Sequence, residues 1–340
     1  MDIFSDIFQE PHDRQKLANA IFQANASSFE DLALRIFRFQ YEGVPVYRQF
    51  CEAFHRHPNH VSRIEEIPYL PIRFFKSHDV IHQQFAATKV FESSVTGGGL
   101  PSRHGVADLA LYEQSFQLGL ERTYGNMQQY DVLALLPSYL ERGTSSLLYM
   151  ADWMIKASSS PLSGFFKDDF SSLQQAIECS KRGNRKLFLL GVTYALLDFA
   201  AAYPQPLPDA IIMETGGMKG RRREMTRSEV HQILSASFQV NQIHSEYGMT
   251  ELLSQLYAVH NGRFQEPPWV KVLTRELLDP LQLQKAPATG ALNVIDLANF
   301  YSCSFLATDD LARINGDGTI EIIGRIDQSE VRGCNLLYAN

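Results

Sequence analysis

The sequence predicts an α/β protein with a parallel sheet, followed by a small antiparallel part. From about residue 87, apolar runs typical of buried strands alternate with helical stretches, which is the pattern of parallel α/β layers. Past about residue 262 helices become scarce, and apolar residues alternate with polar ones as in half-buried strands. We therefore divide the chain into a helical part (1–86), an α/β part (87–261) and a β-rich part (262–340).

The composition is that of a globular protein. The 340 residues are 45% hydrophobic and 20% charged, enough to bury a large core. The net charge of −7 argues against nucleic acid as the main partner, because phosphate binding needs a basic surface. Four scattered cysteines lack metal-ligand or disulfide spacing, so we expect reduced thiols in a cytoplasmic protein. The acidic N-terminus is unlike a secretory signal, and no apolar run is long enough for membrane insertion.

Each part has its own expected elements. Apolar residues between Phe29 and Phe54 recur near helical spacing, and Pro45 splits the run. The segment 67–80 carries two prolines and paired aromatic residues, which predicts an extended segment packed on a surface. In the β-rich part, Gly316 and Gly318 mark a hairpin tip. In the α/β part we expect strands at 132–140, 187–191 and 211–217, and helices at 108–124, 171–181 and 227–238.

The stretch 244–251, HSEYGMTE, is the first candidate for a binding site. It follows the apolar run 238–243, so we interpret it as the exit of a strand into a tight loop, where open α/β sheets bind ligands. An ordinary turn, with Thr250 capping a helix that begins at Glu251, explains the same residues. The stretch also has the parts of a nucleotide and metal site. These are an aromatic plane from Tyr247, a flexible backbone at Gly248, a hydroxyl from Thr250 and a carboxylate from Glu251.

Two glycine-rich turns offer backbone that a ligand can approach closely. In 93–104, SSVTGGGLPSRH, backbone amides and hydroxyls could cradle phosphate oxygens. A purely structural loop would explain the same residues. The stretch is not a Walker loop, because no GK[ST] follows the glycines. In 214–220, ETGGMKG, Gly216 and Gly217 could admit a flat ring, or could form a tight turn with positive φ. The candidates in the first loop are Ser94, Thr96, Gly97, Gly98 and Gly99.

Two charged motifs and a cysteine lie nearer the C-terminus. Asp310, at the end of TDD, could accept both ribose hydroxyls, and Arg325 of GRID could donate to ribose or phosphate. Considered separately, the Asp310 and Arg325 side chains could each be a solvated charge in a turn. Cys334 has an arginine two residues before it, and a nearby cation favours the nucleophilic thiolate. A small buried cysteine is the alternative.

Taken in order, these stretches resemble the motifs of the adenylate-forming superfamily of acyl-CoA synthetases and peptide-synthetase adenylation domains. SSVTGGGLPS is similar to its TSGTTGxPK loop, ETGGMKG to its adenine-side glycine turn, YGMTE to YGxTE, ATDD to TGD and GRID to the GRxD hinge. IFRFQYEGVPVYRQF, IPYLPIRFFKSH and RGCNL resemble the acyl-protein synthetase (LuxE-type) family over nearly the whole chain.

This resemblance implies the N-terminal core of an adenylate-forming enzyme, with two α/β subdomains plus a small distorted β-barrel. It also implies that ATP and a fatty acid give an acyl-adenylate and pyrophosphate, and that the acyl group then passes to Cys334. An acyl-accepting reductase or a carrier protein would be the protein partner. The implied catalytic residues are Cys334, Glu251 and Thr250, with Mg²⁺ on Glu251 and Thr250 at the α-phosphate.

The implied ATP (AMP) site draws on all the motifs. Ser94, Thr96 and Gly97, Gly98 and Gly99 would hold the phosphates. Tyr247 and Gly248 would face Gly216 and Gly217 across the adenine, and Asp310 and Arg325 would fix the ribose.

The sequence departs from the superfamily at two positions of the first loop. Val95 stands where the motif usually has Gly, and Ser102 replaces its Lys. The chain ends about a dozen residues after Asp327, so we expect no mobile C-terminal lid with its catalytic lysine, which disfavours an ordinary CoA ligase. Two alternatives stay open: an adenylating ligase that uses CoA or a carrier protein, and a non-catalytic relic that keeps the fold and perhaps nucleotide binding.

Overall fold

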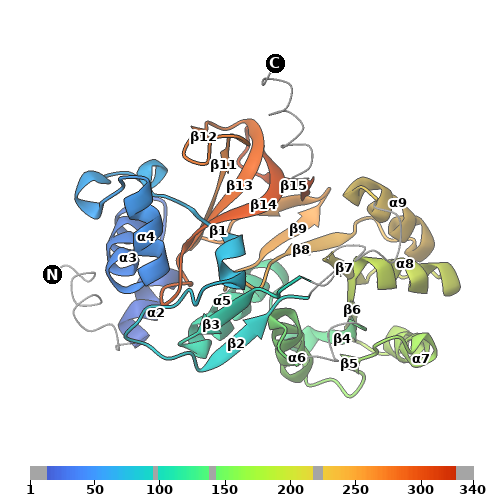
Figure 1. Ribbon diagram of the computed structural model, residues 1–340. Helices are drawn as coiled ribbons and strands as arrows, with labels where there is room; N and C mark the ends of the chain where they lie inside the picture. The colour runs from blue at the N-terminus through green and yellow to red at the C-terminus, as the bar shows by residue number, and fades with distance from the viewer. Residues whose placement is uncertain (1–13, 95–98, 138–142, 217–224, 327–340) are drawn as a thin grey trace.

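The computed structural model describes residues 14–94, 99–137, 143–216 and 225–326 (Figure 1). Within these ranges one sheet of 13 strands runs through the molecule in the order β12-β11-β13-β14-β15-β10-β9-β8-β7-β6-β4-β5, with β1 paired to β14. Strands β4 to β8 are parallel, and every pairing from β8 to β15 is antiparallel. The predicted α/β class is confirmed, but the antiparallel strands continue the parallel sheet rather than forming a separate antiparallel part.

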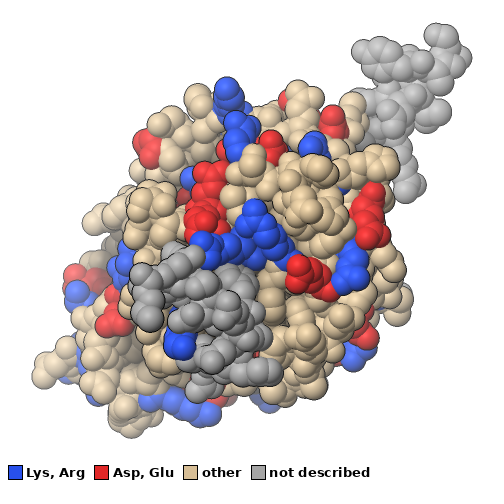
Figure 2. Space-filling view, turned by 90° about the vertical axis from the view of Figure 1, so that its left-hand side faces the viewer, with Lys and Arg blue, Asp and Glu red and all other residues tan. Residues whose placement is uncertain are grey.

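The N-terminal part is helical, as predicted. Helices α2 (Arg14–Phe22), α3 (Phe29–Gly43) and α4 (Pro45–Ala53) lie together at one side of the molecule (Figure 1). Helix α3 buries a face with three- and four-residue spacing, and Pro45 opens α4 at a position where its missing N–H costs nothing. On the face that these helices help to form, acidic and basic side chains are interspersed (Figure 2).

The segment 67–80 is only briefly extended. Strand β1 (Leu70–Pro71) pairs with β14, and a 3₁₀ helix, Ile72–Lys76, follows at once. The prediction of an extended segment is therefore wrong beyond Pro71. The turn buries Phe75 against the ring of His104, at 5.3 Å between centroids, and leaves Phe74 against Phe50 at 5.7 Å.

The parallel strands and their helices match the predicted order. The two-stranded sheet of β2 (Lys89–Glu92) and β3 (Arg103–Val106) precedes them. The elements that follow are α5 (Leu109–Tyr124), β4 (Tyr130–Leu135), α6 (Ser146–Ser158), β5 (Gly164–Phe165), α7 (Phe170–Lys181), β6 (Lys186–Val192), α8 (Thr193–Ala202), β7 (Ile211–Thr215) and α9 (Arg227–Phe238). Capping by Asp108 and a capping box at Thr226 begin α5 and α9.

The strand that leads into HSEYGMTE is displaced from its expected place. The run 238–243 is not a strand, because Phe238 ends α9 and Gln239 caps it with a φ of 51°. Strand β8 is His244–Tyr247 itself. Thr250 and Glu251 lie in a turn with no helix after it, so the helix-capping alternative for Thr250 is wrong.

The β-rich part continues the same sheet. Its strands are β9 (Leu256–His260), β10 (Arg263–Gln265), β11 (Val270–Arg275), β12 (Leu283–Gln284), β13 (Ala288–Asp296), β14 (Phe305–Ile314) and β15 (Ile320–Arg325). Gly318, with a φ of 81°, lies at the predicted hairpin tip between β14 and β15. The proposed boundary after residue 261 falls inside the β9–β10 hairpin, and the division of the chain into three parts stays a prediction. No helix in the described ranges is long and apolar enough to cross a bilayer.

Candidate functional site

The predicted site residues fall into two groups. Thr96, Gly97, Gly98, Gly217 and Cys334 lie outside the described residues, as does Val95. Ser94, Gly99, Gly216, Tyr247, Gly248, Thr250, Glu251, Asp310 and Arg325 are described.

One corner of the site joins three predicted residues from three strands. The Tyr247 hydroxyl on β8 donates to Asp310 Oδ2 on β14 at 2.7 Å. Asp310 and Arg325 are opposite each other in the β14–β15 ladder, with Arg325 Nε 3.9 Å from Asp310 Oδ1. The Arg325 side chain is 85% exposed, so this pair is weakly held and its guanidinium is accessible to a ligand. Burial raises the pKa of Asp310, although the hydrogen bond from Tyr247 opposes the shift.

The Thr250–Glu251 turn is fixed through its backbone. His104 on β3 donates from Nδ1 to the Thr250 carbonyl at 2.7 Å, and Asn299 Nδ2 donates to the Glu251 carbonyl at 2.8 Å. Burial lowers the pKa of His104 to about 4, so its ring is neutral and carries its proton on Nδ1. The turn is thereby held from both sides through its backbone carbonyls.

The next residues are anchored by a buried carboxylate. Asp296 Oδ2 accepts from the amides of Leu253 and Ser254 at 2.8 and 2.9 Å, and Asp296 Oδ1 accepts from the Ser254 hydroxyl at 2.6 Å. Burial raises the Asp296 pKa to about 6, and these hydrogen bonds oppose the shift. Four donors, including the Ala298 amide at 3.2 Å, need an acceptor-only group, so we assign the ionised form at neutral pH.

The stem of the glycine-rich loop lies against this turn. The Ser93 amide donates to the Ser102 carbonyl at 3.0 Å, and the Ser102 amide donates to Ser93 Oγ at 2.9 Å, which closes the loop at its base. The Ser102 side chain lies close enough to the Glu251 carboxylate to lower its pKa. His104, from the same stem, hydrogen-bonds the turn, so the structure brings the described stem of this loop and the motif 244–251 together.

Glu251 has the character expected of a cation ligand. Its side chain is buried, and burial raises its pKa above the usual value, while Ser102 and the charges of Arg325 and Lys76 act in the opposite direction. The described residues contain no group of three or more His, Cys, Asp or Glu side chains that could hold a metal by itself. Mg²⁺ in nucleotide sites commonly uses one or two carboxylates plus phosphate oxygens, and Glu251 fits that kind of site.

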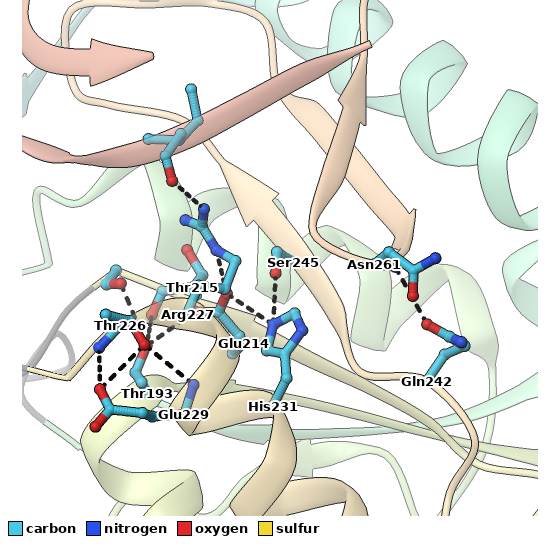
Figure 3. A network of polar contacts seen from close by, with 12 residues as sticks. Thr193, Glu214, Thr215, Thr226, Arg227, Glu229, His231, Gln242, Ser245 and Asn261 are labelled. Carbon is cyan, nitrogen blue, oxygen red and sulfur yellow. Dashed lines mark hydrogen bonds and ion pairs between the residues drawn. The ribbon is translucent and has the colours of Figure 1, made fainter. Parts of the chain in front are cut away.

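A second buried carboxylate, Glu214, lies on β7 two residues before Gly216 (Figure 3). On β7, Glu214 Oε1 accepts a hydrogen bond from Arg227 Nε at 3.2 Å, and Glu214 Oε2 accepts one from the Thr193 hydroxyl at 2.9 Å. His231 Nε2 lies 3.6 Å from Oε1 and 3.1 Å from Ser245 Oγ. Burial alone would raise the pKa of Glu214, but His231 and Arg227 lower it to about 2, so it is a stable anion. Gly216, which directly follows β7, has a φ of 72°.

A third carboxylate, Glu246, lies on the face of β8 opposite to that of Ser245 and Tyr247. Glu246 accepts a hydrogen bond from the Thr215 hydroxyl, and burial and the charge of Glu214 nevertheless raise its pKa to about 7. His244 on the same face contacts the Tyr124 hydroxyl at 3.2 Å, and burial lowers its pKa to about 4. His244 is therefore a neutral, hydrogen-bonded residue beside the core.

Several residues that organise this site were missed from the sequence. His104, Asp296 and Asn299 act over separations of 146, 42 and 48 residues, and no local pattern marks such partners. One local feature could have pointed to Arg227: it is a cation in the first turn of a helix, where the helix dipole favours anions. Such a residue needs a local partner, which here is Glu214.

Comparison with known proteins gives matches at the level of structure. No family model and no curated protein matches the chain. ATP-bound MatB from Rhodopseudomonas palustris is 16% identical with a TM-score of 0.50, covering 69% of this chain and 47% of its own. The chain thus spans about half the length of MatB.

A second ligase is similar over more of the chain. 2-Hydroxyisobutyryl-CoA ligase in the postadenylation state with 2-HIB-AMP is 14% identical with a TM-score of 0.65, covering 89% of this chain and 70% of its own. Its open form with 2-HIB-AMP and CoA gives a TM-score of 0.63 at 13% identity, covering 90% and 72%. At these identities the likeness shows the fold: the chain has the α/β fold of the N-terminal part of adenylate-forming ligases.

Proposed function

We propose that this protein activates a carboxylic acid with ATP, forming an acyl-adenylate and pyrophosphate. The observation that carries this proposal is the convergence of separate motifs around the carboxyl end of β8. Tyr247, Asp310 and Arg325 meet in one corner, and the Thr250–Glu251 turn that follows Tyr247 is tied to the stem of the glycine-rich loop. The fold is that of ligases seen with ATP or an acyl-AMP bound.

The chemistry follows from what these groups can do. A carboxylate oxygen attacks the α-phosphorus, the bond to the pyrophosphate oxygen breaks, and the acid becomes a mixed anhydride with AMP as a good leaving group. Exposed Arg325 and partly exposed Thr250 would be the donors for phosphate or ribose oxygens, and Asp310 would be the acceptor for ribose hydroxyls. Mg²⁺ bound by Glu251 would offset charge on the departing pyrophosphate.

We further propose that the acid is a fatty acid and that the acyl group passes to Cys334. The resemblance of the sequence to acyl-protein synthetases supports this step, in which the thiolate attacks the acyl carbon, AMP leaves and a thioester forms. Two of the other cysteines are poor nucleophiles. Burial raises the pKa of Cys51 to about 12 and raises that of Cys303 further, so neither is a thiolate at neutral pH. Cys179 is exposed on α7.

Replacing Cys334 by Ser is the test of the acyl-transfer step. With ATP, Mg²⁺ and labelled fatty acid, the wild-type protein should gain a label that hydroxylamine removes, and Cys334→Ser should lose it while keeping ATP–pyrophosphate exchange. Cys179→Ser is the matched control and should label normally. Full hydroxylamine-sensitive labelling of Cys334→Ser would reject the assignment. Labelling of added CoA or a carrier protein instead would favour the alternative acceptor.

A further inference from the structure

A single side chain, Arg227 at the start of α9, bridges Glu214 on β7 and the backbone of β15, two strands next to candidate site residues (Figure 3). Its Nε donates to Glu214 Oε1 at 3.2 Å, and its Nη1 donates to the Ile322 carbonyl on β15 at 2.6 Å. The Arg227 side chain is 25% exposed and that of Glu214 is 5% exposed, so the pair is largely shielded from water. One guanidinium thus joins the parallel sheet to the strand that carries Arg325.

On the first side, the contact leads to Gly216. Glu214 also accepts from Thr193, whose hydroxyl lies 3.2 Å from the Gly216 carbonyl. Arg227 therefore orients the Glu214 carboxylate, which in turn holds the Thr193 hydroxyl beside the Gly216 carbonyl. This chain of hydrogen bonds ends at the Gly216 carbonyl.

On the second side, Arg227 takes the place of a missing strand neighbour. The register of β10 with β15 consists of the pair Phe264 and Ile320, because β10 begins directly after the turn at Gly262. Gly262 has a φ of 65°, and a Cβ there would lie 3.3 Å from Arg227 Cδ, so the turn leaves room for the arginine stem. Where backbone pairing stops, Nη1 supplies the donor to Ile322.

The same guanidinium also supports the tyrosine corner. Arg227 Cζ lies 5.0 Å from the centroid of the Phe264 ring, and Phe264 packs edge-on against Tyr247 at 6.2 Å. Tyr247 in turn donates to Asp310, which faces Arg325 three residues beyond Ile322. A planar group with donors on two edges makes all three contacts at once, which a lysine ammonium cannot do.

We propose that Arg227 is a positioning residue that sets the spacing between Gly216 and the Asp310–Arg325 corner, and so the fit of the nucleotide between them. This inference rests on the proposed function. It predicts that Arg227 affects ATP binding without contacting ATP.

The test is Arg227→Lys, which keeps the positive charge beside Glu214 and loses the simultaneous contact with Ile322. The variant should fold, and the KM for ATP in ATP–pyrophosphate exchange should rise about 10-fold while the KM for the acid changes little. By hydrogen exchange, the amides from Ile322 to Ile326 should exchange faster than in the wild type, while amides of β4 and β6 should not change. Arg227→Met should show both effects and also lower the melting temperature, since it leaves the Glu214 charge without its arginine.

The matched control is Arg263→Lys on neighbouring β10. Arg263 donates to Asp317 at 3.2 Å, with both side chains about half exposed, so no change is expected in either measurement. If Arg227→Lys has a wild-type KM for ATP, or if exchange at Ile322 to Ile326 is unchanged, the positioning role is overturned and the proposed function stands. A wild-type protein that binds no ATP overturns the proposed function and the positioning role with it.

Discussion

Replacing Glu251 by Gln is expected to lower ATP–pyrophosphate exchange by about 10²–10³-fold without destabilising the protein. The change removes the charge that would bind Mg²⁺ and keeps the shape of the side chain. Because burial raises the pKa of Glu251, the ionised form is disfavoured in the folded protein without a cation, so a neutral Gln should fold at least as well at pH 7.5. Exchange rates and melting temperature, measured on the same preparation, check both halves of the prediction.

The pH dependence of exchange follows from the same shift. Protons compete with Mg²⁺ for Glu251, and a raised pKa means that this competition begins at higher pH than for an ordinary glutamate. Exchange should therefore fall on acidification from neutral pH, and more Mg²⁺ should restore part of it. The control is Glu266→Gln, a partly buried carboxylate beside Lys271 that lies on no predicted motif. Wild-type exchange in Glu251→Gln would remove Glu251 from the metal site.

Replacing Asp296 by Ala should have the largest effect on stability. The change leaves the buried amides of Leu253 and Ser254 without an acceptor, and each such group costs about 1–3 kcal/mol. We expect a loss of about 3 kcal/mol or more in the free energy of unfolding, measured by urea denaturation. Because this carboxylate anchors the residues after Glu251, exchange should fall as well, even below the melting temperature.

Asp317→Ala gives the matched control for this prediction. Asp317 also accepts from a backbone amide and a hydroxyl, those of Thr319 at 3.0 and 2.6 Å, but at an exposed hairpin tip. Water can replace these hydrogen bonds, so a loss below about 1 kcal/mol is expected. Equal losses in the two variants would contradict the role assigned to Asp296.

The general architecture was predictable because periodicity and capping residues are local signals. Thr226 with Glu229 marks the start of α9, and the apolar run at β4 marks a buried strand. Helix α8 was missed because it is apolar almost all round, which hides the helical period, and α6 was missed as well. Strand β8 was displaced because apolar residues at 238–243 pack as the end of a helix and its exit.

The sequence could predict which motifs belong to the candidate site, but not how their side chains are arranged in space. Tyr247, Asp310 and Arg325 were brought together by resemblance to a family whose motifs have the same order, and the structure places these three side by side. The groups that hold the motifs in place, such as Asn299 and Arg227, are distant in sequence and belong to no motif. Their roles depend on which strands become neighbours, which only the folded chain determines.

A crystal structure with AMP bound tests most directly whether these motifs form one nucleotide site. We predict the adenine between Tyr247 and Gly216, the ribose hydroxyls on Asp310, and Arg325 turned toward ribose or phosphate. AMP bound in another cleft, or a protein that binds no AMP at millimolar concentration, would contradict the proposed site.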